Sequence, residues 1–238
     1  MTRLVAVIVL VILVGCADIN DGQRQAFITF LNTEVIAPPV VKVCELTPGQ
    51  RISFGRYAED YDVLNTAFQE ISDVIYQTGN EDKVTGRIQS ERDNLSLLNE
   101  LRSAQSINNQ FILRLKNVSA QNQRRYNALR LPADLKPVFD AAWEKTVVPF
   151  DETITHVYFL RGKRLDLLVA MGAFLQGQGD KVHFNTDGSA SFSEPEANHY
   201  YRGLQSNLFT VQDDINILTE QMIAVIRSQQ TGAEPAGL

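Results

Sequence analysis

The chain has few of the residues from which metal centres and disulfide frameworks are built. Its 238 residues include two cysteines, three histidines and one tryptophan. Zinc and haem sites draw on cysteine and histidine, and the Cys-x-x-Cys-His sequence of covalent haem attachment does not occur. We therefore expect no metal ion and no cofactor.

Sequence signatures of catalysis are scarce as well, and the Gly-x-Ser-x-Gly elbow of hydrolases does not occur. Glu59, Asp60 and Asp62 form an acidic cluster, but general acid chemistry requires a desolvated carboxyl. Their spacing puts them on the polar side of a helix, so we predict a solvated face and a protein that is not an enzyme. The alternative is an enzyme of cell-wall or lipid metabolism, with a buried carboxylate in a cleft.

Positive charge is also in short supply. The chain has 22 Lys and Arg against 28 Asp and Glu, a net charge of −6, which argues against nucleic acid as a partner. The densest basic group is Arg161, Lys163 and Arg164, which suggests a contact with anionic lipid phosphates. The alternative is that these residues balance nearby carboxylates.

The N-terminal apolar run is too short to cross a membrane. After Arg3 the chain continues from Leu4 to Val14 without a polar residue. About twelve residues at about 1.5 Å each cover about 18 Å, against a hydrocarbon core of about 30 Å. A positive charge followed by such a run is typical of a secretory signal peptide, here residues 1–15.

The run ends in Leu13-Val14-Gly15-Cys16, which resembles the lipobox of bacterial lipoproteins. The resemblance implies thioether attachment of diacylglycerol to Cys16, cleavage between Gly15 and Cys16, and acylation of the new amino terminus. Two or more acyl chains anchor a protein stably, whereas one does not. Ala17 follows the cysteine, and by resemblance to the enterobacterial sorting rule this favours the outer membrane over the inner membrane, with the protein facing the periplasm.

A lipidated Cys16 would leave Cys44 without a partner in the chain, which excludes a disulfide-stapled fold even in an oxidising periplasm. Cys44 follows Val40-Val41-Lys42-Val43, an apolar neighbourhood, so we expect a buried and inert thiol. A redox or intermolecular role would require a lowered thiol pKa.

Most of the remaining chain has the apolar spacing of helices. A short helix is predicted over residues 23–36, ended by Pro38-Pro39. The capping box Thr47-Pro48-Gly49-Gln50 predicts the start of a second helix, which continues to Gly79. Its apolar seam alternates intervals of three and four residues: Phe54, Tyr57, Tyr61, Leu64, Phe68, Ile71 and Ile75.

Four further elements follow. We expect one helix over residues 82–129 and another over 134–178, which Pro149 kinks or splits. Two alternating runs around Asp187-Gly188 predict a β-hairpin. The last helix opens at Ser193 and carries a second seam: Ala197, Tyr201, Leu204, Leu208, Val211, Ile215, Leu218, Met222 and Val225.

These elements predict an all-α fold, an elongated antiparallel four-helix-type bundle with a short N-terminal helix and one small β-hairpin before the last helix. The structural alternative is an open coiled-coil hairpin that dimerises. The domains would be a signal peptide over residues 1–15, a lipidated tether over 16–22, the helical bundle over 23–229 and a disordered tail over 230–238.

A metal- or cofactor-binding bundle is a further alternative. Glu196 and His199 have the Glu-x-x-His spacing of di-iron bundles, but such a site needs two copies and two further glutamates. The turn around His183 and Asp187 imitates the spacing of a calcium loop, although calcium prefers oxygen ligands to imidazole.

Three stretches occur together and in order. The first is Gln-Arg-Gln-Ala-Phe-Ile-Thr-Phe-Leu at residues 23–31, and the second is Asp-Leu-Lys-Pro-Val-Phe-Asp at residues 134–140. The third marks the hairpin: Gly179, Val182, Phe184 and Gly188. Together they resemble the YiaF-like lipoproteins of Gram-negative bacteria, a family known as a domain of unknown function. The resemblance implies a mostly helical envelope lipoprotein, and it carries over no catalytic residue. We therefore expect a lipid-anchored protein that holds or contacts another envelope component.

Overall fold

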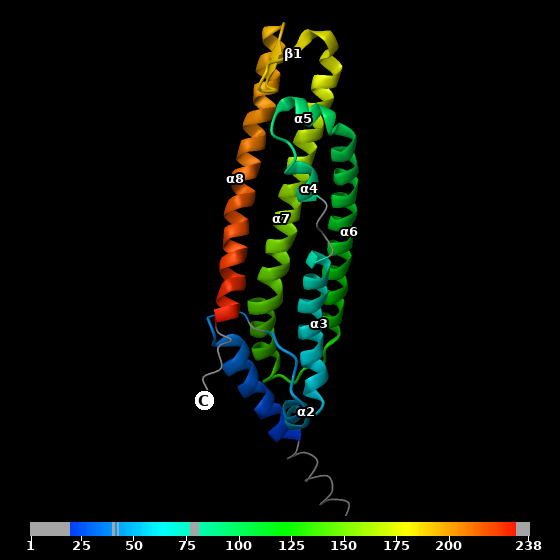
Figure 1. Cartoon of the computed structure of the whole chain (residues 1–238). Helices are drawn as coiled ribbons and strands as arrows, with labels where there is room; N and C mark the ends of the chain where they lie inside the picture. Colours follow the sequence, from blue (N-terminus) through cyan, green and yellow to red (C-terminus); the bar gives the residue numbers. More distant parts are fainter. Residues whose placement is uncertain (1–19, 40, 42, 77–80, 232–238) are drawn as a thin grey trace, which may run out of the picture. The chain divides into compact units, whose positions relative to one another are not determined.

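The structure, a computed structural model, describes residues 20–39, 41, 43–76 and 81–231. These residues are mostly helical and include one small antiparallel hairpin before the last helix (Figure 1). The predicted all-α fold class is thereby confirmed. The predicted signal peptide lies outside the described residues, as do residues 232–238 of the predicted tail.

The chain divides into two compact units. Unit 1 contains the chain up to Glu70, Ser119–Asp151 and the segment from Arg227 onward. Unit 2 contains Ile71–Val118 and Glu152–Ile226. Each unit is described by itself below.

Unit 1 begins with an α-helix over residues 20–30, continued by a π-helix, η1 (Leu31–Ile36). Phe27, Leu31 and Val35 form its buried face. The helix predicted over residues 23–36 is confirmed, with a start three residues earlier. It ends before Pro38 and Pro39, since a proline lacks the backbone N–H that would continue the hydrogen-bond ladder and therefore disfavours extension of a helix.

The capping box predicted at Thr47 is present. The N–H of Gln50 donates to Oγ1 of Thr47 at 3.2 Å, and the N–H of Thr47 donates to Oε1 of Gln50 at 2.9 Å. This cap starts α2 (Pro48–Phe54), which ends at Gly55 with φ +54° and ψ −127°. α3 (Tyr57–Tyr76) follows, so the prediction of one continuous helix is wrong. Only glycine adopts this backbone conformation without strain, and the apolar spacing continues through it unchanged.

The seam predicted from the heptad spacing faces the core of unit 1. Phe54, Tyr57 and Leu64 are buried. Phe68 is half-buried, and its ring stacks on Phe150 with the centroids 4.6 Å apart. The spacing therefore identified the correct faces even though it missed the break at Gly55.

The single helix predicted over residues 82–129 is also wrong. The segment forms three helices: α4 (Glu81–Thr85), α5 (Glu91–Ser96) and α6 (Leu98–Ala128). Ser90 starts α5, since its hydroxyl accepts a hydrogen bond from the N–H of Asp93 at 3.2 Å. The carboxylate of Asp93 in turn accepts from the N–H of Gln89 at 3.1 Å. A serine cap of this kind favours a new helix start inside a stretch that contains no proline.

α7 (Lys136–Gln178) continues through Pro149 without interruption, so the predicted split does not occur. Within unit 2, α6 and α7 are antiparallel. Asn108 lies against Gly162, whereas Leu98, earlier in α6, lies against Gly172, later in α7. The absence of a side chain at these two glycines lets the helices approach closely.

The predicted hairpin is confirmed. It consists of β1 (Val182–Phe184) and β2 (Ala190–Phe192), preceded by the 3₁₀-helix η2 (Gly179–Lys181). The hairpin turn rests on α5: the N–H of Arg92 donates to the carbonyl of Gly188 at 3.1 Å, and Gly188, with φ +82°, lies against Ser90. Beneath the hairpin is a buried cluster of Met171, Leu175 and Tyr201.

α8 (Pro195–Thr231) is the last helix, so residues 230 and 231 of the predicted tail are helical. The seam members up to Leu218 are buried or half-buried, and Tyr201 and Ile215 are the deepest in the described part of the helix. Phe209 and Ile217 lie off the seam and are exposed. The predicted face of α8 is thereby confirmed.

The conformation of Gly55 leads to a testable prediction. Replacing Gly55 by alanine should lower the free energy of unfolding of unit 1 by about 1–3 kcal/mol, because alanine is strained at this φ and ψ. Gly49, in α2, has open space where a side chain would stand, so Gly49→Ala should be neutral or stabilising by up to about 1 kcal/mol. Urea unfolding followed by Trp143, the only tryptophan in the sequence, checks both values. Equal effects of the two substitutions would contradict the prediction.

Candidate functional site

The predicted lipidation site, Gly15 and Cys16, lies outside the described residues. The first described helix begins at Asn20, four residues after Cys16. The candidate site is therefore the part of unit 1 against which this helix packs. We call its aromatic side chains the docking cluster: Phe27, Phe30, Phe54, Tyr57, Tyr61 and Phe139.

Phe27 is the centre of the docking cluster and is 0% exposed. Its ring centroid lies 5.4 Å from that of Phe54 and 6.1 Å from that of Tyr57. The rings of Tyr61 and Phe139 lie 6.4 and 6.5 Å away. Burial of one phenylalanine side chain contributes about 1.5–3 kcal/mol, and each favourable ring pair adds about 0.5–1.5 kcal/mol. The N-terminal helix is therefore firmly attached to α2, α3 and α7.

Phe30 extends this attachment by one helical turn. Its ring centroid lies 5.0 Å from that of Phe54 and 5.4 Å from that of Tyr61, which it meets nearly edge to face. The two phenylalanines of the N-terminal helix thus share the same two partners. α2, although only seven residues long, is held between them and α3.

Ion pairs hold the first turns of the N-terminal helix. Arg24 contacts Asp21 at 2.9 Å within the helix and Asp134 at 3.0 Å, just before α7. The Arg24 side chain is 22% exposed, so its charge is partly shielded from solvent. The pair with Asp134 joins two segments more than a hundred residues apart in sequence.

Lys145 of α7 holds the other end of the same helix. Its ammonium group donates hydrogen bonds to the carbonyl oxygens of Ile36 and Pro38. The last carbonyls of a helix have no partner within the helix and carry partial negative charge, so a cation there is favourable. The N-terminal helix is thus fixed at its start, its centre and its end.

The run at residues 134–140 has a structural explanation in unit 1. Leu135 and Phe139 are both fully buried. Asp140 accepts a hydrogen bond from the hydroxyl of Tyr126 at 2.6 Å and contacts the ammonium of Lys136 at 2.7 Å. Burial by itself would raise the pKa of the Asp140 carboxyl, but the hydrogen bonds from Lys136 and Tyr126 outweigh it and hold the pKa below its usual range. Burial and the hydrogen bond to Asp140 together raise the pKa of Tyr126 to about 12.

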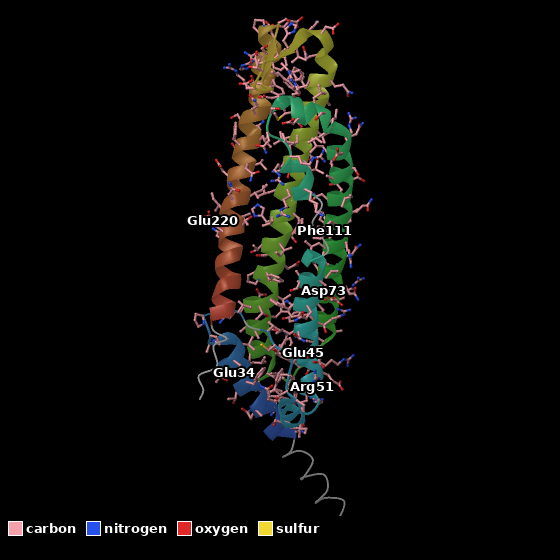
Figure 2. All side chains as sticks on the ribbon, in the orientation of Figure 1. Glu34, Glu45, Arg51, Asp73, Phe111 and Glu220 are labelled. Carbon is pink, nitrogen blue, oxygen red and sulfur yellow. The ribbon has the colours of Figure 1, made fainter. Side chains whose placement is uncertain are left out.

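The carboxylates of the predicted acidic cluster, Glu59, Asp60 and Asp62, differ in their surroundings and do not form one site. Asp62 forms a two-point ion pair with Arg51, with both N–O distances 2.8 Å. Arg51 is labelled in Figure 2. Glu59 is exposed, and Asp60 is half-buried. Burial raises the pKa of Asp60, and the charge of Arg56 lowers it in part. Pairing with arginine is the main role that the structure gives to Asp62.

The expectation that Cys44 is buried is wrong, because the structure exposes it. The backbone of Cys44 is nevertheless held, since the hydroxyl of Tyr61 donates to its carbonyl at 3.0 Å. The apolar residues before Cys44 suggested a buried segment, but its neighbour Leu46 is the one that is buried.

The basic residues Arg161, Lys163 and Arg164 lie on α7 in unit 2 and do not form one patch. The guanidinium of Arg161 lies 5.1 Å from the ring centre of Tyr158, and the ammonium of Lys163 lies 4.7 Å from that of Phe159. Arg164 is half-buried and donates to Gln212 at 3.1 Å and to Thr85 at 3.2 Å. A contact of these basic residues with lipid stays a prediction. The hydrogen bonds of Arg164 to Gln212 and Thr85 would compete with a lipid phosphate for its guanidinium.

Metal ligands are not gathered in the described part of the chain. Across it, no group of three or more His, Cys, Asp or Glu side chains is placed to hold a metal ion. Glu196 and His199 are both exposed on α8. None of the described helices has both the length and the apolar character that crossing a membrane requires.

The polar contacts that hold the N-terminal helix in unit 1 were not predicted from the sequence. The partners of Arg24 and Lys145 lie about a hundred residues away along the chain, and no local sequence pattern predicts these contacts. The strongest available signal was the run at residues 134–140, where two charged residues at i and i+4, Lys136 and Asp140, frame a buried phenylalanine.

Comparison with known proteins supplies the family. The sequence model described as "Protein of unknown function (DUF3053)" matches residues 4–232. Proteins named "Uncharacterized protein YiaF" from Escherichia coli strain K12 and from Shigella flexneri are each 28% identical over 199 residues, or 83% of this chain and 84% of the relative. No solved structure matches the chain. The resemblance to YiaF-like proteins is thereby confirmed.

The docking cluster predicts a large effect of truncation at its centre. Phe27→Ala should lower the free energy of unfolding of unit 1 by about 3–5 kcal/mol, because it removes a fully buried ring. Ile52→Ala, at a side chain that is 78% exposed in the same unit, should change it by less than about 0.5 kcal/mol. Urea unfolding followed by the fluorescence of Trp143, which is buried in unit 1, measures both. A loss below about 1 kcal/mol for Phe27→Ala would show that the helix is only loosely attached.

The contacts of Asp140 predict a pH dependence. Its pKa is lower in the folded protein than the usual 3.8, so its contribution is present above that pH and is lost as the pH falls through the folded value. Asp140→Asn should therefore destabilise unit 1 at pH 7, by up to about 1 kcal/mol, and the difference from wild type should shrink below pH 3.8. Unfolding curves across this pH range test it. Glu59→Gln, at an exposed carboxylate of the same unit, is the control, and a constant difference for Asp140→Asn would contradict the assignment.

Proposed function

The chain belongs to the DUF3053 family of proteins of unknown function, and we propose that it is a bacterial lipoprotein whose Cys16 carries the lipid anchor. Support comes from the N-terminal sequence, where Arg3 and the apolar run from Leu4 to Val14 lead into Leu13-Val14-Gly15-Cys16. The run is too short to span a bilayer, so cleavage and lipid attachment explain it better than a membrane helix does.

The observation that carries the proposal is the position of Cys16 relative to the fold. The cysteine ends the apolar run and stands four residues before a helix whose Phe27 is fully buried. A lipid on Cys16 would thus be joined to unit 1 through a short tether and a well-packed helix.

The attachment is a defined chemical sequence. The Cys16 sulfur loses its proton and forms a thioether with a diacylglycerol carbon, which releases its phosphate-linked headgroup. Water then cleaves the Gly15–Cys16 peptide bond. The freed amino group of Cys16 attacks an acyl ester of a phospholipid, which forms the amide and releases the lysophospholipid with its hydroxyl protonated. The resulting chains are enough for stable anchoring, which a single chain does not provide.

In this proposal the protein faces the periplasm from the outer membrane, since Ala17 rather than aspartate follows the cysteine. It acts as a structural or interaction module that holds or contacts another envelope component, not as an enzyme. The ion pairs of unit 1 favour this role. The carboxylates of Asp134, Asp62 and Asp140 are paired with Arg24, Arg51 and Lys136, respectively. They serve there to hold elements together.

Metabolic labelling tests the proposal. In cells given labelled palmitate, the wild-type protein should take up the label, and Cys16→Ser should take up none and keep its first fifteen residues, which a size shift reveals. Cys44→Ser is the matched control, because it removes the other cysteine, which is exposed, and should be labelled like wild type. Label on Cys16→Ser, or none on the wild type, would refute the proposal.

A further inference from the structure

Ile52 is the most exposed large apolar side chain among the described residues, with 78% of its surface accessible. It stands on α2 next to Arg51, and Arg56 follows it within four residues; both arginines are exposed. A single exposed isoleucine is common on protein surfaces and needs no partner on that ground alone. Its relation to the N-terminal segment is what sets Ile52 apart from the others.

α2 is fixed beside the first turns of the N-terminal helix. Phe54 of α2 packs against Phe27 and Phe30, with ring centroids 5.4 and 5.0 Å apart. Directly after α2, Gly55 lies so close to Gln23 that a side chain on the glycine would overlap the Gln23 amide. Figure 1 shows α2 beside the start of this helix, drawn in dark blue. All these contacts lie within unit 1.

The length of chain between Cys16 and the fold limits the distance of α2 from the lipid. Four extended residues span at most about 14 Å, and the three helical steps from Asn20 to Gln23 add about 4.5 Å. The contact between Gln23 and Gly55 therefore lies within about 20 Å of Cys16, and any bend in the tether brings it closer. So short a tether keeps this surface at a high effective concentration near the bilayer.

We propose that the exposed surface of α2 is a membrane contact, in which Ile52 enters the headgroup region of the bilayer that holds the Cys16 lipid. This inference rests on the proposed lipidation of Cys16 and adds a second contact between the protein and the membrane. Insertion removes the most exposed apolar side chain from water. It also fixes the orientation of unit 1 relative to the bilayer.

The two arginines suit this surface. Arg51 is held in place by its two-point pair with Asp62, yet its side chain stays 45% exposed. The guanidinium of Arg56 lies 4.8 Å from the ring centre of Tyr57 and is anchored by that contact. Guanidinium groups donate several hydrogen bonds at once to phosphate oxygens. When Ile52 is inserted, the guanidinium groups of Arg51 and Arg56 are therefore already positioned to donate hydrogen bonds to neighbouring lipid phosphates.

The full-length lipidated protein is the material for the test. In a Cys44→Ser background the only thiol left after lipidation is one introduced by design. Ile52→Cys is labelled with a polarity-sensitive fluorophore, and the protein is reconstituted into vesicles of phosphatidylethanolamine and phosphatidylglycerol. Gln69→Cys is the matched control: it is exposed in the same unit but twelve residues beyond Tyr57 on α3, about 18 Å along that helix.

The proposal predicts an emission shift to shorter wavelength and quenching by brominated lipids at position 52, with neither at position 69. Equal and unquenched emission at both positions, on protein that floats with the vesicles, would overturn the membrane contact and leave the lipid anchor intact. Failure of the protein to float, together with the absence of a lipid mass on Cys16, would overturn both. Quenching at both positions would also overturn it, since unit 1 would then meet the bilayer without the orientation set by α2.

Discussion

The burial of Phe27 is the interaction on which the rest of unit 1 depends. This one ring touches side chains from the consecutive helices α2 and α3 and from α7, which begins much later in the chain. Arg24 and Lys145 add polar contacts near the start and at the end of the same helix. The N-terminal helix is thus a structural part of unit 1. Any constraint on the position of its first residue therefore also constrains the position of the whole unit.

Unit 2 is held together by its hairpin and by the short helix α5. Its hairpin covers the apolar cluster around Tyr201 and is joined to α5 through Gly188 and Arg92. Glu91 of α5 accepts a hydrogen bond from Gln205 of α8 at 2.8 Å, which links the short helix to the long one. Short elements therefore lock long helices together in both units, with α2 in this position in unit 1 and α5 in unit 2.

Spacing alone predicted which helix faces are buried. The alternation of three and four residues placed Tyr57, Leu64 and Tyr201 in cores, and the Asp-Gly turn predicted the hairpin. Helix ends were predicted less well, because single residues decide them. The conformation of Gly55 and the cap at Ser90 each interrupted a helix whose apolar pattern continued.

The candidate site was predictable only in part for a related reason. The capping box at Thr47 and the run at residues 134–140 are local patterns and were visible in the sequence. The ion pair of Arg24 with Asp134 depends on the tertiary fold, as does the exposure of Cys44. A run of apolar residues beside a cysteine does not determine to which side its thiol points.

We propose that the mature chain starts at a lipidated Cys16, a few residues before the first described helix of unit 1. Mass spectrometry of the N-terminal peptide from protein purified out of bacterial membranes tests this most directly. We expect a peptide that begins at Cys16 and carries the mass of a diacylglycerol thioether and an amide-linked acyl chain. A mature chain that begins at another residue, or a Cys16 with an unmodified thiol, would contradict it.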